Sequence, residues 1–423
     1  MKRLISAALT TVILASAQVQ ATVSDEDFAQ LKADLAALAQ RLTALEAENS
    51  SLRELSESTI TELSVAQTEL AHINTSTAAI SWAQRIRIKG DFRYRYEEID
   101  VEGGDTRERN RIRARAAIVA SLPANTEVAL GIATGGDDPV STNQTLGGGG
   151  STKDVRLDLA YAKWNATGNS YLVAGKMKNP FYRPQKSALL WDSDYTPEGF
   201  GAGWVGERFF ATFSGTWLES DSKKDNQQFS WGVQGGSKIA LGEASLTSGV
   251  GYYKIPTKGK SAFFGDDDDF FGNSFECSDP ADLSSCVYTY DYEEIEVFAD
   301  LGLNVFDMPV NLFANYVQNQ DADDYDTGWI AGVKVGKASG HGTWQMAYQY
   351  QDLEKDAVLG LLSDSDFAGG GTDGKGHRLT GAYGINKQWN LGFTWFIDNE
   401  AGEGNLGKPL SYDRFMIDTV FKY

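Results

Sequence analysis

The sequence is poor in the residues that carry metal and redox chemistry, with two cysteines and three histidines among 423 residues. The histidines, His72, His341 and His377, lie far apart in the chain, so they offer no metal-ligand spacing. The cysteines, Cys277 and Cys286, stand nine positions apart in a polar loop. In an oxidising compartment we expect such a pair to close a small disulfide loop. The sequence therefore predicts no cofactor and no metal site.

Long hydrophobic runs and excess positive charge are missing as well. Outside the N-terminus, no stretch of about 18 apolar residues is available to cross a bilayer as a helix. The formal net charge of -20 repels phosphate, which argues against nucleic acid as a partner. Aromatic residues, at 12%, and glycine, at 44 residues, are abundant, as expected of many strands joined by glycine-containing turns.

Residues 1–21 have the pattern of a secretory signal peptide. Lys2 and Arg3 precede an apolar stretch, and a small-residue cleavage site ends at Ala17 or Ala21. A membrane-anchoring helix is the alternative, but the apolar part is short and contains threonines. We therefore expect an exported mature chain.

A heptad repeat follows, within a predicted segment of residues 22–80. Apolar residues recur at spacings of three and four from Phe28 to Ile73 in one unbroken register. This pattern predicts a coiled coil of roughly 70 Å that associates with other copies of the chain. Asn49 at an a position can fix the register at some cost in stability, while leucine at both a and d leaves dimer or trimer open. An ordinary amphipathic helix would need neither the length nor the strict period.

Residues 81–423 change to alternation with a period of two. They contain sixteen alternating segments, most of about ten residues, the length at which a tilted strand crosses the hydrocarbon layer. Short and long connections alternate along the chain, as in a barrel inserted from one side of a membrane. A soluble β-sandwich is the alternative, but it gives no reason to sort loops by length. The predicted fold class is an all-β transmembrane barrel of 16 antiparallel strands, preceded by an α-helical coiled coil.

The final segment, DRFMIDTVFKY, ends on an aromatic residue, and the stretches GKMKNPFYRP (175–184) and WDSDYTPEGFG (191–201) lie at the two ends of the long loop expected at 180–198. With the signal peptide, the strands and the rod, these features resemble the trimeric outer-membrane porins of Gram-negative bacteria, in particular the family described as "putative porin". The resemblance implies a homotrimer in outer-membrane lipid and lipopolysaccharide, a periplasmic coiled coil, and passive transport. The rod makes peptidoglycan or a periplasmic protein a candidate partner. The coiled coil and the long loop 256–290 depart from general-diffusion porins, so no selectivity is implied.

Basic residues alternate with apolar ones in two neighbouring strands, RIRIKGDFRYRYEE (85–98) and RERNRIRARAAIVAS (107–121). Arginine on the lipid face costs about 2–4 kcal/mol at the bilayer midplane, so both runs must point into the lumen. Walls of Arg and Lys favour the passage of anions. The predicted basic ladder consists of Arg85, Arg87, Lys89, Arg93, Arg95, Arg107, Arg109, Arg111, Arg113 and Arg115.

The loop at 180–198 is predicted to supply the opposing charge. If it folds inward, its carboxylates face the ladder across a constriction, where polar solutes align in the transverse field. The candidate constriction residues are Arg183, Lys186, Asp192, Asp194 and Glu198. In the alternative interpretation, the ladder is a solvated lumen face, paired with Asp154, Arg156 and Asp158, that sets no preference.

The sequence thus favours a porin for small hydrophilic solutes, with a preference for anions such as carboxylates or phosphate. One alternative is a tether in which the barrel anchors the rod between outer membrane and cell wall. An outer-membrane enzyme is another, but no nucleophile, base and orienting group are placed together. We therefore predict no enzymatic activity.

Overall fold

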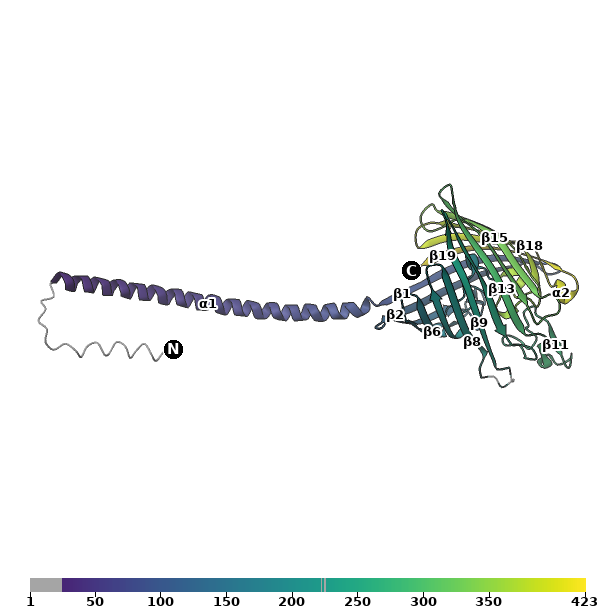
Figure 1. Ribbon diagram of the computed structural model, residues 1–423, viewed down its shortest axis with the longest axis horizontal. Helices are drawn as coiled ribbons and strands as arrows, with labels where there is room; N and C mark the ends of the chain where they lie inside the picture. The colour runs from purple at the N-terminus through teal and green to yellow at the C-terminus, as the bar shows by residue number, and fades with distance from the viewer. Residues whose placement is uncertain (1–24, 222, 224–225) are drawn as a thin grey trace. The chain divides into compact units, whose positions relative to one another are not determined.

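The computed structural model describes residues 25–221, 223 and 226–423, and the predicted signal peptide lies outside them. The chain divides between Ala83 and Gln84 into two units, each considered by itself. The first contains α1 (Asp25–Ala83), a continuous helix of 59 residues (Figure 1). Among the described residues, no helix has the length and apolar character required to cross a membrane.

Among the described residues of the first unit, the apolar stripe of α1 has no partner. Phe28, Leu31 and Leu70 are 67%, 60% and 63% exposed. Isolated helices gain little stability in water, and most helical stability in proteins comes from packing an apolar face. The stripe is therefore available for association, and the coiled coil stays a prediction.

The second unit is a β-barrel. Among the described residues, sixteen long strands form its wall. They are β1 (Ile86–Val101), β2 (Arg107–Leu122), β3 (Thr126–Thr134), β5 (Val155–Asn165), β6 (Ser170–Lys176), β7 (Glu198–Val205), β8 (Phe209–Glu219), β9 (Gln228–Leu241), β10 (Ala244–Ile255), β13 (Tyr292–Val305), β14 (Met308–Asn319), β15 (Thr327–Gly336), β16 (Trp344–Leu353), β17 (Gly374–Gly384), β18 (Trp389–Ala401) and β19 (Leu410–Lys422).

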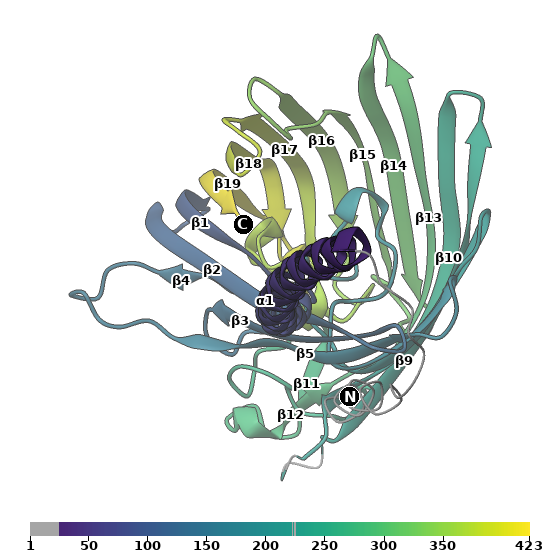
Figure 2. The ribbon, with the colours of Figure 1, turned by 90° about the vertical axis from the view of Figure 1, so that its left-hand side faces the viewer.

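Each wall strand pairs antiparallel with the next, and β19 returns beside β1 to close the barrel (Figure 2). The predicted barrel of sixteen antiparallel strands is confirmed. The remaining short elements lie in the connections. They are β4 (Gln144–Thr145), η1 (Pro184–Lys186), β11 (Phe275–Cys277), η2 (Leu283–Ser285), β12 (Cys286–Tyr288), η3 (Gly360–Leu362), η4 (Phe367–Gly369) and α2 (Glu403–Leu406).

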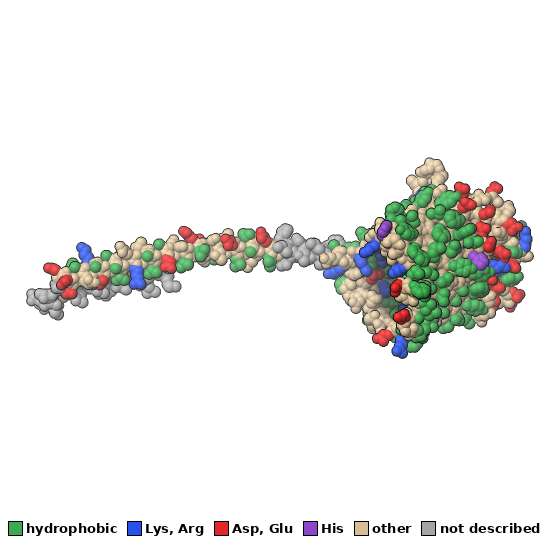
Figure 3. Space-filling model, turned by 90° about the horizontal axis from the view of Figure 1, so that it is seen from above, with side chains coloured by type: hydrophobic (Ala, Val, Ile, Leu, Met, Phe, Trp, Pro, Cys, Tyr) green, Lys and Arg blue, Asp and Glu red, His purple; other side chains and the backbone are tan. Residues whose placement is uncertain are grey.

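The two faces of the wall differ as the alternation predicts. Along β8, Phe209 and Trp217 are 60% and 51% exposed, whereas Phe210 and Ser214 are 7% and 2% exposed. Hydrophobic side chains cover the visible wall of the barrel, and acidic side chains gather at the end that carries the long loops (Figure 3). An apolar outer band with polar ends is the surface of a membrane-spanning barrel.

Three long loops fold into the bore: the third loop (177–197), the fifth loop (256–291) and the seventh loop (354–373). Their apolar residues form a core inside the barrel. The loop residues of this core include Leu189, Leu190, Trp191, Phe270, Tyr288, Leu359, Leu361 and Leu362. The wall contributes inner-face residues of β10 and β13 to β16, namely Tyr253, Ile255, Tyr292, Phe313, Val317, Ile330 and Leu353.

Polar contacts fix the fifth loop to the seventh loop. The Asn273 side-chain amide donates to the carbonyl oxygens of Lys355 and Val358 at 2.6 and 2.8 Å. The Ser274 backbone N–H donates to Asp356 at 2.8 Å. One side of the bore is therefore packed, although it also buries Glu294, Glu296 and Asp300 of β13, and the opposite side holds the basic ladder.

Candidate functional site

The basic ladder lies on the inner side of the barrel and divides into a buried middle and exposed ends. The middle consists of Arg93, Arg95, Arg109, Arg111, Arg113 and Arg115, with side chains between 5% and 23% exposed. Arg85, Arg87, Lys89 and Arg107 are exposed, and the side chain of Arg87 is 60% exposed.

Strand register brings like charges together in the middle of the ladder. Arg93 lies directly opposite Arg113, and Arg95 lies opposite Arg111. Like charges at directly opposite positions destabilise a sheet. The arrangement is stable only if carboxylates lie close by.

Strand β1 itself carries two of these carboxylates on its inner face. Asp91 contacts Arg113 and Arg115 at 2.9 and 2.7 Å. Glu97 is fully buried and contacts Arg109 at 2.5 Å and Arg111 at 3.6 Å. Sequence reasoning missed both, although their odd numbers place them on the same face as the arginines of β1.

The third loop brings a further carboxylate to the ladder. Asp194 contacts Arg115 and Arg113 at 3.0 and 3.4 Å and accepts a hydrogen bond from Thr142 at 3.0 Å. Although burial opposes it, Arg113 and Arg115 hold the pKa of Asp194 below its usual value. Asp194 is therefore a charged group facing the ladder.

The other candidate residues of this loop lie elsewhere. Arg183 donates to the Trp191 carbonyl oxygen at 2.7 Å, and Lys186 is exposed within η1. Glu198 begins β7 and pairs with Lys176 at 2.9 Å, with its side chain 63% exposed. The register of β6 and β7 puts both on the outer face, so Glu198 does not oppose the ladder.

The residues of the alternative interpretation do not neutralise the ladder through ion pairs. Asp154 and Arg156 pair with each other at 3.7 Å, and both are exposed. Asp158 lies within hydrogen-bond distance of Thr196, at 3.5 Å. It lines a cavity together with Arg115, without an ion pair among the described residues.

The seventh loop supplies counter-charges that sequence reasoning missed. Asp366 contacts Arg414 at 2.9 Å and Arg95 at 3.0 Å, and Arg414 also pairs with Glu97. Asp364 pairs with Arg378 at 3.2 Å. The only local indication was the apolar run AVLGLL (357–362) in an otherwise polar loop.

The third and seventh loops meet at a buried carboxyl group. Asp192 accepts hydrogen bonds from the backbone N–H and hydroxyl of Ser365, at 3.0 and 3.1 Å. Its own N–H donates to the Leu362 carbonyl oxygen at 2.7 Å. Burial, with the Asp364 carboxylate acting in the same direction, raises the pKa of Asp192 to about 8. This group is neutral over most of the physiological range, unlike Asp194.

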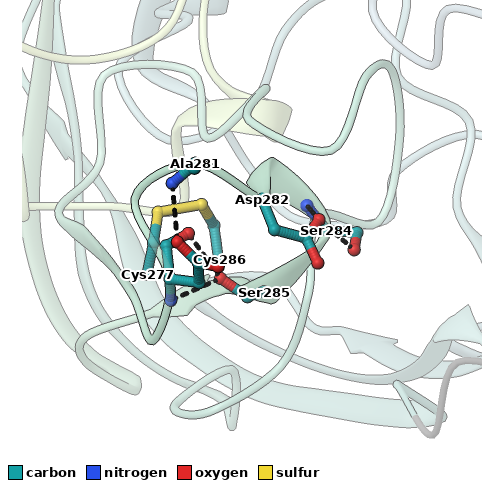
Figure 4. Close-up of a disulfide and its surroundings, with 7 residues drawn as sticks. Cys277, Ala281, Asp282, Ser284, Ser285 and Cys286 are labelled. Atoms are coloured by element: carbon teal, nitrogen blue, oxygen red, sulfur yellow. Dashed lines mark hydrogen bonds between the residues drawn. A yellow bond between two sulfur atoms is a disulfide. The ribbon is translucent and has the colours of Figure 1, made fainter.

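A disulfide closes a small subloop within the fifth loop. Cys277 and Cys286 are joined at the ends of β11 and β12, with Cα atoms 3.9 Å apart (Figure 4). Between them the Asp282 side chain accepts from the Ser284 N–H at 3.1 Å, which caps η2. The bridge braces a loop tip and lies outside the charged network.

The network can impose a field across the bore. Every arginine of the ladder middle contacts a carboxylate; Arg93 does so through Asp418 at 3.8 Å. The carboxylates come from β1, β19 and two inward loops, so fixed charges of both signs face each other. Fixed charges in a narrow bore act on passing ions and dipoles at close range.

The model of the family described as "putative porin" matches residues 101–261 and 281–423. Among solved structures, OprB of Pseudomonas putida at high pH is similar, with 12% identity and a TM-score of 0.55, covering 82% of this chain and 96% of that chain. OmpF of Salmonella typhi in complex with daunomycin has 12% identity and a TM-score of 0.48, covering 80% and 97%. OmpT of Vibrio cholerae in its trimer form has 10% identity and a TM-score of 0.44, covering 80% and 99%. A comparison with curated protein sequences finds no match.

Proposed function

The chain belongs to the family described as "putative porin", and we propose that its barrel carries small hydrophilic solutes by passive diffusion across the outer membrane. We propose further that it prefers small anions such as carboxylates or phosphate. The family and the fold imply the outer membrane as the location.

The observation that carries this proposal is the contrast between the outer and inner faces of the barrel wall, seen along β19. On β19, Ile417 and Phe421 are 48% and 38% exposed on the outer face, while Arg414 and Asp418 face inward into ion pairs. Apolar side chains outside suit lipid, and charged side chains inside suit a water-filled bore. In a soluble barrel, this apolar outer face would be exposed to water.

The anion preference rests on the basic groups that carboxylates leave free. Asp91, Glu97 and Asp194 neutralise the ladder middle, whereas Arg85 and Lys89 at one end are exposed. Unneutralised positive charge along a bore raises the local concentration of anions. The preference is therefore expected to be moderate.

The test is the reversal potential of single channels in planar bilayers under a KCl gradient. Wild type is expected to pass ions and to favour chloride. Asp194→Asn removes a charge that faces Arg113 and Arg115, so the anion-to-cation permeability ratio should rise by about two- to tenfold. A wild-type protein that inserts but does not conduct would overturn the channel.

Glu198→Gln is the matched control, because it makes the same chemical change in the same region, but on the outer face. It should leave the ratio unchanged. Equal shifts in both variants would show that the charge facing the ladder does not set the preference.

We also propose that α1 holds the protein in a homotrimer. The support is the exposed heptad stripe; the heptads alone do not specify the strand number. Leu35→Asp with Leu45→Asp, at a and d positions, should reduce the oligomer measured by light scattering in detergent. Gln40→Asp, outside the stripe, should not.

A further inference from the structure

Three lysines in the bore differ from the arginines beside them, because they have no carboxylate partner. Lys89 lies on β1, Lys178 follows β6 at the start of the third loop, and Lys422 ends β19. Among the described residues none of the three forms an ion pair, and all three are exposed. The arginines of the ladder middle, by contrast, are all paired.

The three lysines share one cavity. A cavity of about 440 Å³ is lined by Lys89, Lys178 and Lys422, together with Arg115 and two carboxylates, Asp91 and Asp158. Such a volume lies within the range of pockets for small organic ligands.

Strand register explains how these residues meet. Asp91 lies opposite Lys422 across β1 and β19, and opposite Arg115 across β1 and β2. Next to them, Ala117 lies opposite Gly131 of β3. The site is therefore built mainly on wall strands, and the start of the third loop adds Lys178.

Two small residues, Gly131 and Ala117, line the cavity and leave its volume open. A Cβ atom added at Gly131 would lie 3.1 Å from Leu159 Cβ and 3.4 Å from Ala117 Cβ. Both small residues line the cavity, so a larger side chain at either position would reduce its volume.

The charge in the cavity favours an anion. Asp91 is occupied by Arg113 and Arg115, which leaves Asp158 as the carboxylate without an ion pair among the described lining residues. Three free ammonium groups thus face one free carboxylate.

We propose that this cavity, which we name the lysine cavity, binds a small multivalent oxyanion during its passage. Carboxylate and phosphate oxygens offer the same acceptors to lysine ammonium groups, so both classes fit. This inference rests on the proposed channel function and locates its anion preference. The lysine cavity, and not the paired arginines, is the place where an anion pauses.

The test is block of the KCl current by added inorganic phosphate or, in a separate arm, citrate, measured on single channels of the full-length protein. Wild type should show concentration-dependent block. The variant Lys89→Gln, Lys178→Gln, Lys422→Gln should need about tenfold more of the same anion for half block. Stronger block by citrate than by phosphate would identify carboxylates as the preferred class, and the reverse would identify phosphate.

The matched control is Lys334→Gln. Lys334 lies on the inner face of β15, where it has no ion pair among the described residues, and register places it opposite Asn311 of β14. This variant should keep the wild-type block. If Lys334→Gln weakened block to the same extent per charge, or if wild type conducted without any block, there would be no discrete site.

A wild-type protein that does not conduct would instead contradict the channel itself. Failure of the channel and failure of the anion site are therefore distinguishable.

A further variant, Gly131→Leu, fills the cavity without removing charge. It should abolish block while KCl conductance persists. Retained block in this variant would overturn the proposal.

Discussion

The wall of β1 and β2 and the wall of β10 and β13 to β16 belong to one barrel, yet their inner faces solve different problems. The first carries arginines that need carboxylates brought from two loops and from β19. The second carries mainly apolar side chains that loop residues cover, and the buried Glu294 and Glu296 there accept hydrogen bonds instead of forming ion pairs. In both cases the loops fold inward because they complete the inner face. On one side they supply carboxylates for the arginines, and on the other they cover apolar side chains.

This difference separates a tightly packed side of the bore from a charged side. Apolar burial packs loops tightly and excludes water, whereas ion pairs tolerate water beside them. The third loop takes part in both, since Leu189 belongs to the core and Asp194 contacts Arg115. It therefore joins the packed side of the bore to the ladder.

The largest effect on stability is expected from removing the charge of Glu97, the most buried carboxylate beside the basic ladder. Glu97→Gln leaves Arg109 and Arg111 without their carboxylate and removes one of the two partners of Arg414. Removing one member of a buried ion pair costs about 3–5 kcal/mol. The midpoint of urea unfolding in detergent should fall accordingly, and an unchanged midpoint would mean that water compensates these arginines.

The apolar wall should respond to a change that leaves every charge in place. Leu359 is 1% exposed in the core of the seventh loop, so Leu359→Ala should cost about 2–4 kcal/mol in the packing of that loop. The channel should show larger and noisier single-channel currents, because a loosened loop blocks less of the bore. Leu406→Ala, at a residue that is 59% exposed, is the matched control and should leave currents unchanged.

Unfolding measured over a range of pH tests the contact between the third and seventh loops, where Asp192 lies. The pKa of Asp192 is raised from 3.8 to about 8, chiefly by burial. The folded state therefore holds an extra proton between these values, so stability falls as pH rises from about 4 to about 8. The Asp192→Asn side chain cannot titrate. Over this pH range its free energy of unfolding, measured by urea unfolding, should therefore fall by roughly 1–3 kcal/mol less than that of wild type.

Asp194→Asn is the control for this series. The pKa of Asp194 is lowered, because Arg113 and Arg115 outweigh its burial, so it stays ionised throughout the window. Its removal should lower stability at every pH and leave most of the slope, because burial and Asp364 raise the pKa of Asp192 more than Asp194 does. An Asp192→Asn protein with the wild-type slope would show that another group titrates.

Local pattern was sufficient to predict the wall but not the interior. Alternation placed Phe209 and Trp217 outside and Arg113 inside, because side chains of a strand point alternately to its two faces. The inward loops follow from complementarity between distant segments: Asp366 reaches Arg95 across 271 positions of the chain. No period or spacing encodes such a pair.

Some of the site could have been found from the sequence by the same parity rule. Asp91 and Glu97 share the inner face with Arg93 and Arg95, so partial neutralisation of the ladder was predictable. Glu198 shows the converse, since two residues after Thr196 the chain has already entered β7 and the side chain points outward. The exact residue at which a loop becomes a strand decides such cases, and sequence patterns locate it poorly.

The smallest effect is expected at the exposed end of the ladder. Arg87 pairs with Glu127 at 2.9 Å, but its side chain is 60% exposed. Exposed ion pairs contribute less than about 1 kcal/mol, so Arg87→Gln should leave the unfolding midpoint almost unchanged. Breaking the same kind of ion pair where it is buried, around Glu97, is expected to lower the stability several times more. If the two variants lowered the midpoint equally, burial would not be what separates the middle of the ladder from its ends.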